Sequence, residues 1–406
     1  VPHIIRARRS KVSENGEVER DDLELLRADL SKRLNGFNSN YPDVSVYELR
    51  SSRLSREEFP VPEMLLLMLR NVLGWRWSGT GEKIRWTVYG SFNGEPLSIE
   101  LGKFGLTMRS SPVLDESRRR IEGQLKSAVN LVEQFIKPMI DNQITNGELT
   151  IGNHLTEFMS RYEFFRDKAD KAFRRADRKA REKPKESGEF PEGIISALMH
   201  GYSRSMSDQQ EGFYYSVAMV DAYFSALEHR LNLLRAFTGV PLPAEGFKAF
   251  MSKTWNEKVD ELLGENPSPR ARKALQGMRD IKERIRNPFA HGGYENDKGA
   301  LHVHIPTIGA IPGNITKFGK SARFSFIPVG VNDHKLNCTV FDEVDKLLST
   351  DQLAAPYRLM VAGIDPSFNE KSLCSYRDAI SGGDKALERF IDRWHHMWER
   401  HANMDY

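Results

Sequence analysis

Hydrophobic residues recur at helical spacing over most of the chain. A step of three to four positions places such residues on one face of a helix. The clearest case is 211–237, where apolar residues alternate steps of four and three, as in the seam of a helix that packs in a bundle. Similar patterns predict further helices over 21–34, 62–73, 114–140, 152–182, 268–286, 341–349 and 384–400.

The pattern changes in the first quarter of the chain. Residues 83–92 and 96–109 are rich in β-branched and aromatic residues, which favour strands. The two segments flank Asn93-Gly94, a dipeptide typical of tight hairpin turns. The sequence therefore predicts an antiparallel hairpin in an otherwise helical N-terminal region.

A run rich in proline, glycine and charge at 183–193 interrupts the helical pattern, and we place a hinge or domain boundary there. The boundary separates an α+β N-terminal region, 1–185, from a helical bundle, 190–406. The chain is long enough for two domains, each with its own core. Segments 300–306 and 322–328 alternate with a period of two, which predicts a small β excursion within the bundle. The expected fold is mainly α.

The charges nearly balance, with 59 Lys and Arg against 56 Asp and Glu. A net charge of +3 does not by itself indicate a nucleic-acid-binding protein, so any basic surface must be local. The predicted helix 152–182 ends in such a stretch. There Arg174, Arg175 and Arg178 are candidate RNA contacts, and a solvated charged surface is the alternative.

The two cysteines, Cys338 and Cys374, make neither a disulfide framework nor a metal cluster, which fits a reducing cytoplasm. His302 and His304 share a face of a predicted strand, but no nearby pattern completes a metal site around them. No run approaches the ~18 apolar residues of a membrane helix. We expect a cytoplasmic protein with no membrane segment, no metal and no cofactor.

The most informative chemistry lies in MRDIKERIRNPFAHGG at 278–293, which contains Arg286, Asn287 and His291. A neutral imidazole acts as a base or an acid near pH 7. A guanidinium offers paired donors to two phosphate oxygens, and an amide orients either partner. RNA cleavage without a metal needs these functions, because the 2′-OH loses a proton, the leaving oxygen gains one and the phosphate charge is stabilised.

This Arg-Asn-x-x-x-His motif closely resembles that of the HEPN superfamily, whose members are helical nucleic-acid-processing domains. The resemblance covers about 190–300 and extends to the C-terminal helices, and it does not cover 1–180. It implies that Arg286 and His291 cleave RNA, and that two protomers place their motifs side by side across a shared cleft. It also implies a role in a toxin system or in antiviral defence.

The spacing within the motif raises a geometric problem. Positions 286 and 291 on a continuous helix differ by roughly 140° and would not share a face. Pro288 disfavours helical geometry at the preceding residue and fits the first turn of a new helix. We therefore expect a break at Asn287, with this residue as the cap of the next helix.

Charged residues beside the motif repeat every seven positions. Asp221 and Glu228 lie beside the seam of one predicted helix, and Arg279 and Arg286 lie beside the seam of the next. If the helices are antiparallel neighbours, Glu228 orients Arg286 and Asp221 supports it, while Arg279 is a weaker RNA contact. The alternative is a solvated charged edge.

The sequence supports three hypotheses. The first is a homodimeric, metal-independent endoribonuclease whose N-terminal region restrains it, selects its RNA or senses a regulatory protein or nucleic-acid trigger. The second is a catalytically silent HEPN-like module that holds RNA or dimerises, since a fold can persist without its activity. The third is a structural interaction protein, in which Arg286, Asn287 and His291 only end a helix.

Overall fold

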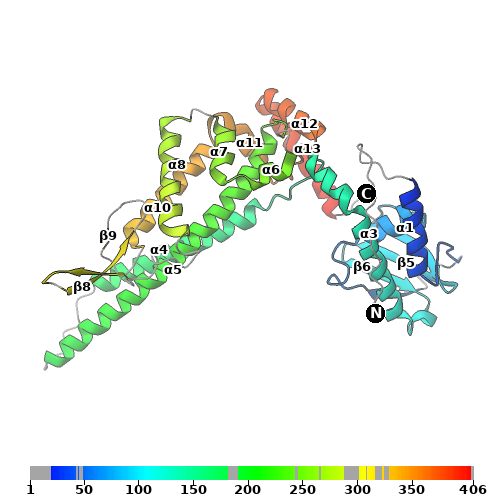
Figure 1. The fold of residues 1–406 in the computed structure, drawn as a ribbon, viewed down its shortest axis with the longest axis horizontal. Coiled ribbons are helices and arrows are strands. Elements are labelled where there is room, and N and C mark those ends of the chain that lie inside the picture. The colour runs from blue at the N-terminus through cyan, green and yellow to red at the C-terminus, as the bar shows by residue number, and fades with distance from the viewer. Residues whose placement is uncertain are drawn as a thin grey trace. The chain divides into compact units, whose positions relative to one another are not determined.

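The structure is a computed structural model, and the chain divides into two compact units (Figure 1). The first comprises residues 1–148 and 389–406, and the second comprises residues 149–388. The structure describes residues 20–42, 44, 49–181, 191–242, 246–264, 267–287, 301–307, 309–315, 322–323 and 329–403. The described chain is mainly α with a smaller antiparallel β region, which confirms the coarse fold class expected from the sequence.

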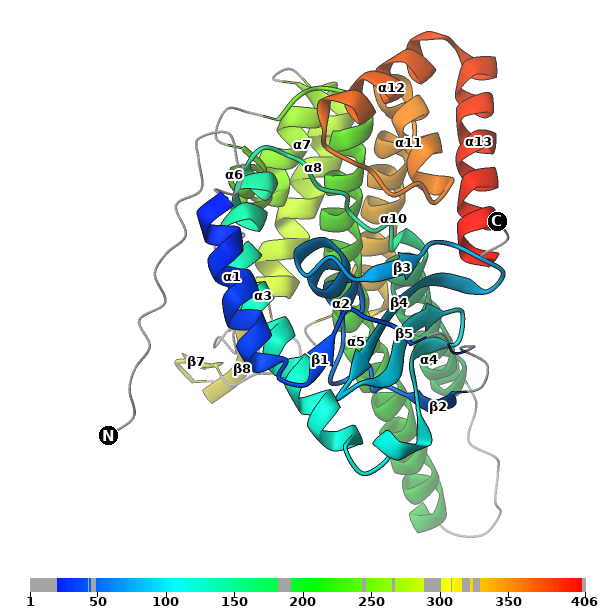
Figure 2. The ribbon, with the colours of Figure 1, turned by 90° about the vertical axis from the view of Figure 1, so that its right-hand side faces the viewer.

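The first unit contains an antiparallel sheet in the order β1-β4-β5-β6-β2, with β3 paired to β4 (Figure 2). Its strands are β1 (Phe37–Asn38), β2 (Arg50–Arg53), β3 (Arg76–Ser78), β4 (Ile84–Phe92), β5 (Glu95–Gly102) and β6 (Gly105–Ser110). β1, β2 and β3 have two to four residues each, too few to give a period in the sequence.

The predicted hairpin is confirmed. β4 and β5 pair along their length, and the turn residues Asn93 and Gly94 have φ of 51° and 87°. Tight two-residue hairpin turns require such positive φ values, which explains the Asn-Gly sequence. The predicted strand 96–109 is two strands, because a second turn before Gly105, with φ of 122°, divides it into β5 and β6.

Helices of the first unit bury their apolar stripes together with those of the sheet. These helices are α1 (Arg20–Arg33), α2 (Glu63–Leu66) with the π-helical η2 (Leu67–Val72), the 3₁₀ turn η3 (Pro112–Leu114) and α3 (Arg118–Thr145). Leu30, Leu65 and Ile121 from the helices and Val88 from β4 are at most 1% exposed and belong to one cluster. This core gives the first unit its own hydrophobic centre.

The second unit is organised around two long helices, α4 (Leu155–Arg181) and α5 (Pro191–Phe237), which lie side by side (Figure 1). Arg175 contacts Asp208, whereas Tyr162 contacts Tyr223. Residue numbers thus fall along α4 as they rise along α5, so the helices are antiparallel. The predicted helix 211–237 is only the C-terminal part of α5.

The two units meet in sequence near residue 149, whereas the sequence placed a boundary at 185–190. The physical reason for the difference is the packing of α4 along α5, which groups the basic helix with the second unit. The intervening residues 182–190 lie outside the described part of the chain. A proline- and glycine-rich segment that connects two helices of one unit has the same composition as a linker between domains, so composition alone did not distinguish the two.

Further elements follow α5 in the second unit, and the last of them, α13, crosses the boundary after Glu388, so that its later residues belong to the first unit. They are α6 (Gly246–Ser252), α7 (Trp255–Leu263), α8 (Pro269–Ile281), η4 (Lys282–Arg286), β7 (Leu301–Ile305), β8 (Gly309–Ile315), β9 (Ala322–Arg323), α10 (Val331–Leu348), η6 (Asp351–Leu353), α11 (Ala354–Val361), α12 (Glu370–Ser381) and α13 (Asp384–Asn403). β7, β8 and β9 form a small sheet in the region where the sequence predicted a β excursion, but β8 was not among the predicted strands. Residues 324–328 of the predicted second strand lie outside the described chain.

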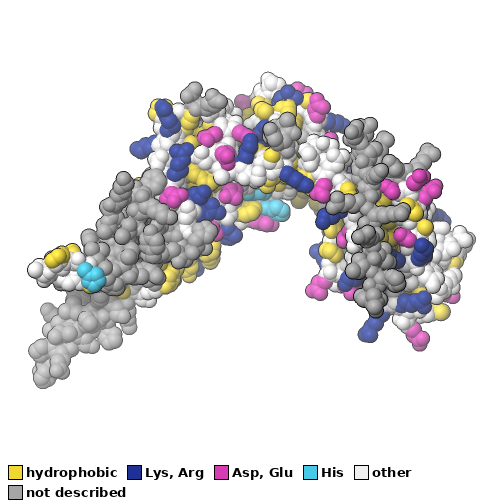
Figure 3. Space-filling view, viewed as in Figure 1, with side chains coloured by type: hydrophobic (Ala, Val, Ile, Leu, Met, Phe, Trp, Pro, Cys, Tyr) yellow, Lys and Arg dark blue, Asp and Glu magenta, His cyan; other side chains and the backbone are white. Residues whose placement is uncertain are grey.

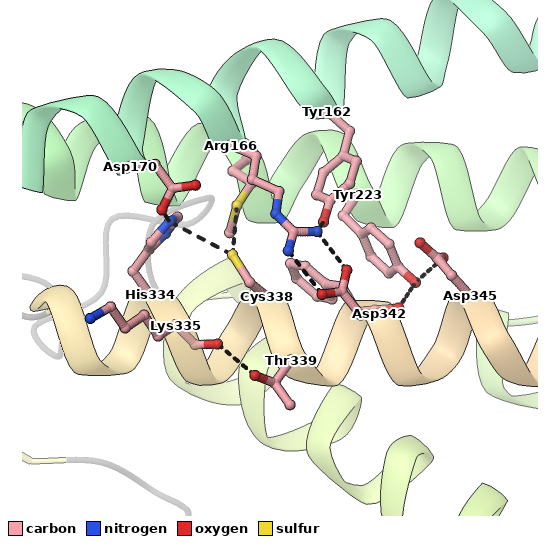
Figure 4. Close-up of polar contacts among 12 residues, drawn as sticks. Tyr162, Arg166, Asp170, Tyr223, His334, Lys335, Cys338, Thr339, Asp342 and Asp345 are labelled. Carbon is pink, nitrogen blue, oxygen red and sulfur yellow. Dashed lines mark hydrogen bonds and ion pairs between the residues drawn. The ribbon is translucent and has the colours of Figure 1, made fainter. Parts of the chain in front are cut away.

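A buried arginine joins α5 to α10 in the core of the second unit. Arg230 is 1% exposed, and its Nη1 donates a hydrogen bond to Oδ1 of Asp345 at 2.6 Å. The hydroxyl of Tyr223 lies 2.8 Å from the same oxygen (Figure 4). The Tyr223 ring stacks on Phe341. Removing one partner of such a pair leaves an uncompensated buried charge.

We predict that Asp345→Ala lowers the free energy of unfolding by about 3–5 kcal/mol, because Arg230 then keeps its charge without a carboxylate. Urea titration followed by circular dichroism measures the loss. Asp342→Ala, one turn earlier on α10, is the matched control. Its ion pair with Arg166 is half exposed on the Asp342 side and is expected to contribute at most about 1 kcal/mol. Equal losses for the two variants would contradict this assignment.

Candidate functional site

The helix that carries the motif changes its winding just before Arg286. α8 begins with a capping hydrogen bond from Ala271 N–H to Ser268 Oγ, and Pro269 occupies its first turn. From Lys282 onward the hydrogen bonds are π-helical, and the N–H of Asn287 bonds to the carbonyl of Lys282. Single π turns inside α-helices often occur at functional sites.

Arg286, at the end of this π turn, lies against α5. Its Nε is 3.7 Å from Oδ1 of Asp221, and its Nη1 is 3.6 Å from Oε1 of Glu228. The guanidinium carbon lies 4.9 Å from the centre of the Phe224 ring, which is fully buried. Both charge contacts are longer than a hydrogen bond, so the carboxylates orient the guanidinium while its N–H groups are not bonded to them.

The seven-residue spacing on α5 accounts for this arrangement. Asp221 and Glu228 are two turns apart and lie on either side of Phe224 along one helix face. The contact between Arg286 and Glu228 expected from the sequence is therefore present, and Asp221 joins it. Arg279, one repeat earlier on α8, has a different partner, because it donates two hydrogen bonds to Oδ1 of Asn256 at 3.0 and 2.6 Å.

Asn287 does not have the conformation that the sequence predicted. Its φ of −62° and ψ of −51° are helical, so the predicted break and cap at this residue are wrong. The π turn changes the direction of the helix end instead, since one additional residue in a turn rotates the later side chains about the helix axis by about 100°. The Asn287 amide donates a hydrogen bond to Oε1 of Glu283 at 3.1 Å, which fixes the orientation of this side chain.

His291 lies outside the described residues, as do the three residues that separate it from Asn287. The structure therefore locates two of the three motif residues, Arg286 and Asn287, on one helix end. The placement of Arg286 beside α5 defines one side of the candidate site.

The basic stretch of α4 is only partly available for RNA. Arg175 pairs with Asp208 at 3.2 Å and with Glu211 at 2.5 Å. Arg174 and Arg178 are exposed, and Nε of Arg174 bonds to a backbone carbonyl of its own helix. Pairing with α5 thus cancels part of the positive charge that the sequence indicated. Basic and acidic side chains are also interspersed on the described surface in Figure 3.

Sequence reasoning missed a buried lysine close to the site. Lys258 on α7 is 4% exposed and donates a hydrogen bond to the carbonyl of Met251 at 3.2 Å. Burial lowers the pKa of Lys258, while the negative charges of Glu228 and Glu261 oppose that change. Its position three residues after the buried Trp255 could have indicated that it faces the core.

A second polar cluster joins α4, α5 and α10 (Figure 4). His334 is 1% exposed, with Nδ1 at 2.7 Å from Ser216 Oγ and Nε2 at 3.2 Å from Asp170 Oδ1. Ser216 is fully buried, so this Ser-His-Asp set has no access to a substrate and serves packing. Cys338 lies beside it, and burial raises the pKa of its thiol to about 11, which makes it unreactive.

The described residues contain no group of three or more His, Cys, Asp or Glu side chains arranged to hold a metal ion. None of the described helices is long and apolar enough to cross a membrane. Comparison of the chain with protein-family models, with curated proteins and with solved structures finds no match.

We predict that the folded state loses stability as the pH falls below about 6.5, the ordinary pKa of histidine. Burial lowers the pKa of His334 in the folded protein, while Asp170 opposes the change. The unfolded chain therefore binds a proton at a higher pH than the folded chain does. The contribution is fully present above pH 6.5 and is lost as the pH falls toward the folded pKa.

Urea unfolding between about pH 7.5 and pH 5.5 measures this dependence. His334→Gln should reduce the slope of stability against pH without abolishing it, because burial also lowers the pKa of His229. His304→Gln, at an exposed histidine of β7, is the control and should leave the profile unchanged. An unaltered slope in His334→Gln would contradict the assignment.

Proposed function

We propose that this protein is a metal-independent endoribonuclease whose C-terminal bundle is HEPN-like. The observation that carries the proposal is the placement of Arg286 at the end of a π turn, between Asp221 and Glu228 and against Phe224. An arginine on a loose charged edge would need no such support from three side chains of a neighbouring helix. Fixed orientation of a phosphate-binding group is what catalysis requires.

The proposed reaction is transesterification within the RNA strand. His291 removes the proton from a 2′-OH, or donates a proton to the leaving oxygen, and the 2′-oxygen forms a bond to the adjacent phosphorus. The bond from phosphorus to the 5′-oxygen breaks, and this oxygen takes up a proton from the protonated His291 or from water, which leaves a 2′,3′-cyclic phosphate and a 5′-OH. If His291 is the acid, water accepts the proton of the 2′-OH. Arg286 stabilises the negative charge on the phosphate oxygens, and Asn287 orients the reacting groups.

The resemblance in the motif supports a homodimer, in which two copies bring their motifs to a shared cleft. A cytoplasmic toxin or an antiviral-defence effector is the biological role we propose with it. The first unit then restrains the nuclease, selects the RNA, or responds to a regulatory protein or nucleic-acid trigger.

A silent RNA-holding or dimerisation module is the second candidate, and one observation favours it. Two carboxylates lie within 3.7 Å of the Arg286 guanidinium, and their negative charge weakens its attraction for phosphate. Under this alternative, the contacts of Arg286 stabilise the bundle and the motif histidine has no catalytic role.

We predict that the purified protein cleaves RNA in the presence of EDTA, and that His291→Ala and Arg286→Ala each lower the cleavage rate by about 10²- to 10⁴-fold. Gel analysis of a labelled RNA measures the rates. Arg270→Ala, at an exposed arginine in the first turn of α8, is the matched control and should cleave as the wild type does. If the folded wild type leaves RNA intact, or if His291→Ala cuts normally, the ribonuclease proposal fails.

We also predict that Glu228→Gln lowers kcat by about tenfold without raising KM. Loss of the carboxylate allows the Arg286 side chain to turn, while removal of a negative charge does not weaken RNA binding. Asp260→Asn, at an exposed acid on α7, is the control. It removes the same charge and should leave kcat unchanged. A higher KM with an unchanged kcat would show that Glu228 does not position Arg286.

A further inference from the structure

At one edge of the sheet in the first unit, β3 lies beside β4 (Figure 2). Aromatic and arginine side chains contact one another along this edge. We call this group the β3 patch; it consists of Tyr41, Arg70, Arg76, Trp77 and Tyr89. Arg76 and Trp77 are exposed, and the other members are partly buried. The patch belongs to residues 1–185, for which the sequence indicated a regulatory or RNA-selecting role but no particular residues.

The geometry of the patch is defined by ring contacts. The guanidinium carbon of Arg70 lies 3.4 Å from the centre of the Trp77 ring. That of Arg76 lies 5.8 Å from the centre of the Tyr89 ring, and Tyr41 meets Tyr89 edge to face at 5.3 Å. Tyr89 is also held by a hydrogen bond of 2.9 Å between its hydroxyl and Ser78.

The sheet register explains why both faces of β3 contribute. Arg76 is paired with Tyr89 and Trp77 with Val88, and adjacent residues of a strand point to opposite faces. Val88 is buried in the core, so the Trp77 side chain leaves β3 on the same face of the sheet as Val88. Because β3 lies at the edge of the sheet, Trp77 nevertheless remains 38% exposed. Charged residues on an edge strand discourage its pairing with strands of other chains. This explains the presence of Arg76 on β3 but not that of the exposed Trp77.

The local charge is positive. Residues 70–89 contain the basic Arg70, Arg76, Lys83 and Arg85 against a single acid, Glu82. Glu82 is exposed and contacts Lys83 at 3.4 Å. A surface that combines ring faces with excess arginine matches the two chemical features of an unpaired nucleic-acid strand, namely flat bases and phosphates.

We propose that the β3 patch binds single-stranded nucleic acid, with a base stacked at Trp77 and phosphate held by Arg76. The stacking requires unpaired bases, so a single strand fits and a duplex does not. Stacking and phosphate contacts are common to RNA and DNA, and the choice of RNA rests on the proposed function. The patch then holds the strand in the first unit, whereas the motif of Arg286 belongs to the second unit.

The test is fluorescence anisotropy of the full-length His291→Ala protein, which should leave the strand uncut, with a labelled RNA of about 12 nucleotides. The same strand as DNA and as an RNA duplex are the comparison ligands. Affinity is measured from about 50 to 200 mM salt, because the logarithm of the association constant falls by about 0.7 per phosphate contact for each tenfold rise in salt.

Trp77→Ala should weaken binding about 5- to 100-fold and leave the salt dependence unchanged. Trp77→Phe should retain binding, because it keeps a ring face. Trp77→Leu should bind as weakly as Trp77→Ala, although it keeps apolar volume. If the indole only packed against the protein, Trp77→Leu would bind as the parent protein does.

Arg76→Ala should lower the salt slope by about 0.7, and Arg76→Lys should restore it. Phe104→Ala, at a 78% exposed aromatic in the turn before β6, and Arg119→Ala, at an exposed arginine of α3, are the matched controls and should bind as the parent protein does.

Absence of any affinity for the single strands at low salt overturns the proposal, as does normal binding by Trp77→Ala or an equal loss in Phe104→Ala. Equal affinity for RNA and DNA supports the patch and overturns only the choice of RNA. The binding readout does not require cleavage. A wild-type protein that binds through the patch and leaves RNA intact therefore refutes the ribonuclease alone.

Discussion

The candidate site depends on the contact between η4, which continues α8, and the C-terminal half of α5. Ile281 and Ile285 are buried at this end of the helix, and Arg286 comes directly after them. Apolar burial thus places the guanidinium beside α5, and the two carboxylates determine how it is turned. Because Asp221 and Glu228 are 61% and 45% exposed and lie beyond hydrogen-bond distance of Arg286, these charge contacts contribute little to stability, and their main effect is on orientation.

The rest of α5 supplies a rigid support for that contact. Arg230 and Arg235 are both buried, and each is held by partners on another segment. Arg230 bonds to Asp345 on α10, while Arg235 bonds to the carbonyls of Val240 and Pro241 after the helix end. These hydrogen bonds hold the part of α5 that follows the residues facing Arg286. Precise positioning of a functional group requires such support.

Much of this could be predicted from the sequence because it depends on local periodicity. The seven-residue spacing of Asp221 and Glu228 indicated the contact with Arg286, and Asn93-Gly94 indicated the hairpin. The π turn was not predictable, because the sequence pattern of α8 is compatible with continuous α-helix up to Pro288. The burial of Arg230 was equally hidden, since a charged residue is expected at the surface until its partner from a distant helix is known. The short strands β1, β2 and β3 are defined by their pairing and not by their own residues.

In the proposed mechanism, the RNA itself supplies the attacking 2′-OH. The most direct test is cleavage of an RNA in which the nucleotide before the main cut carries 2′-deoxyribose, compared with the unmodified strand. We expect that cleavage at that position disappears, while other cuts persist and end in a 2′,3′-cyclic phosphate. Unchanged cleavage at the deoxy position would contradict it, because another nucleophile would then be attacking the phosphorus.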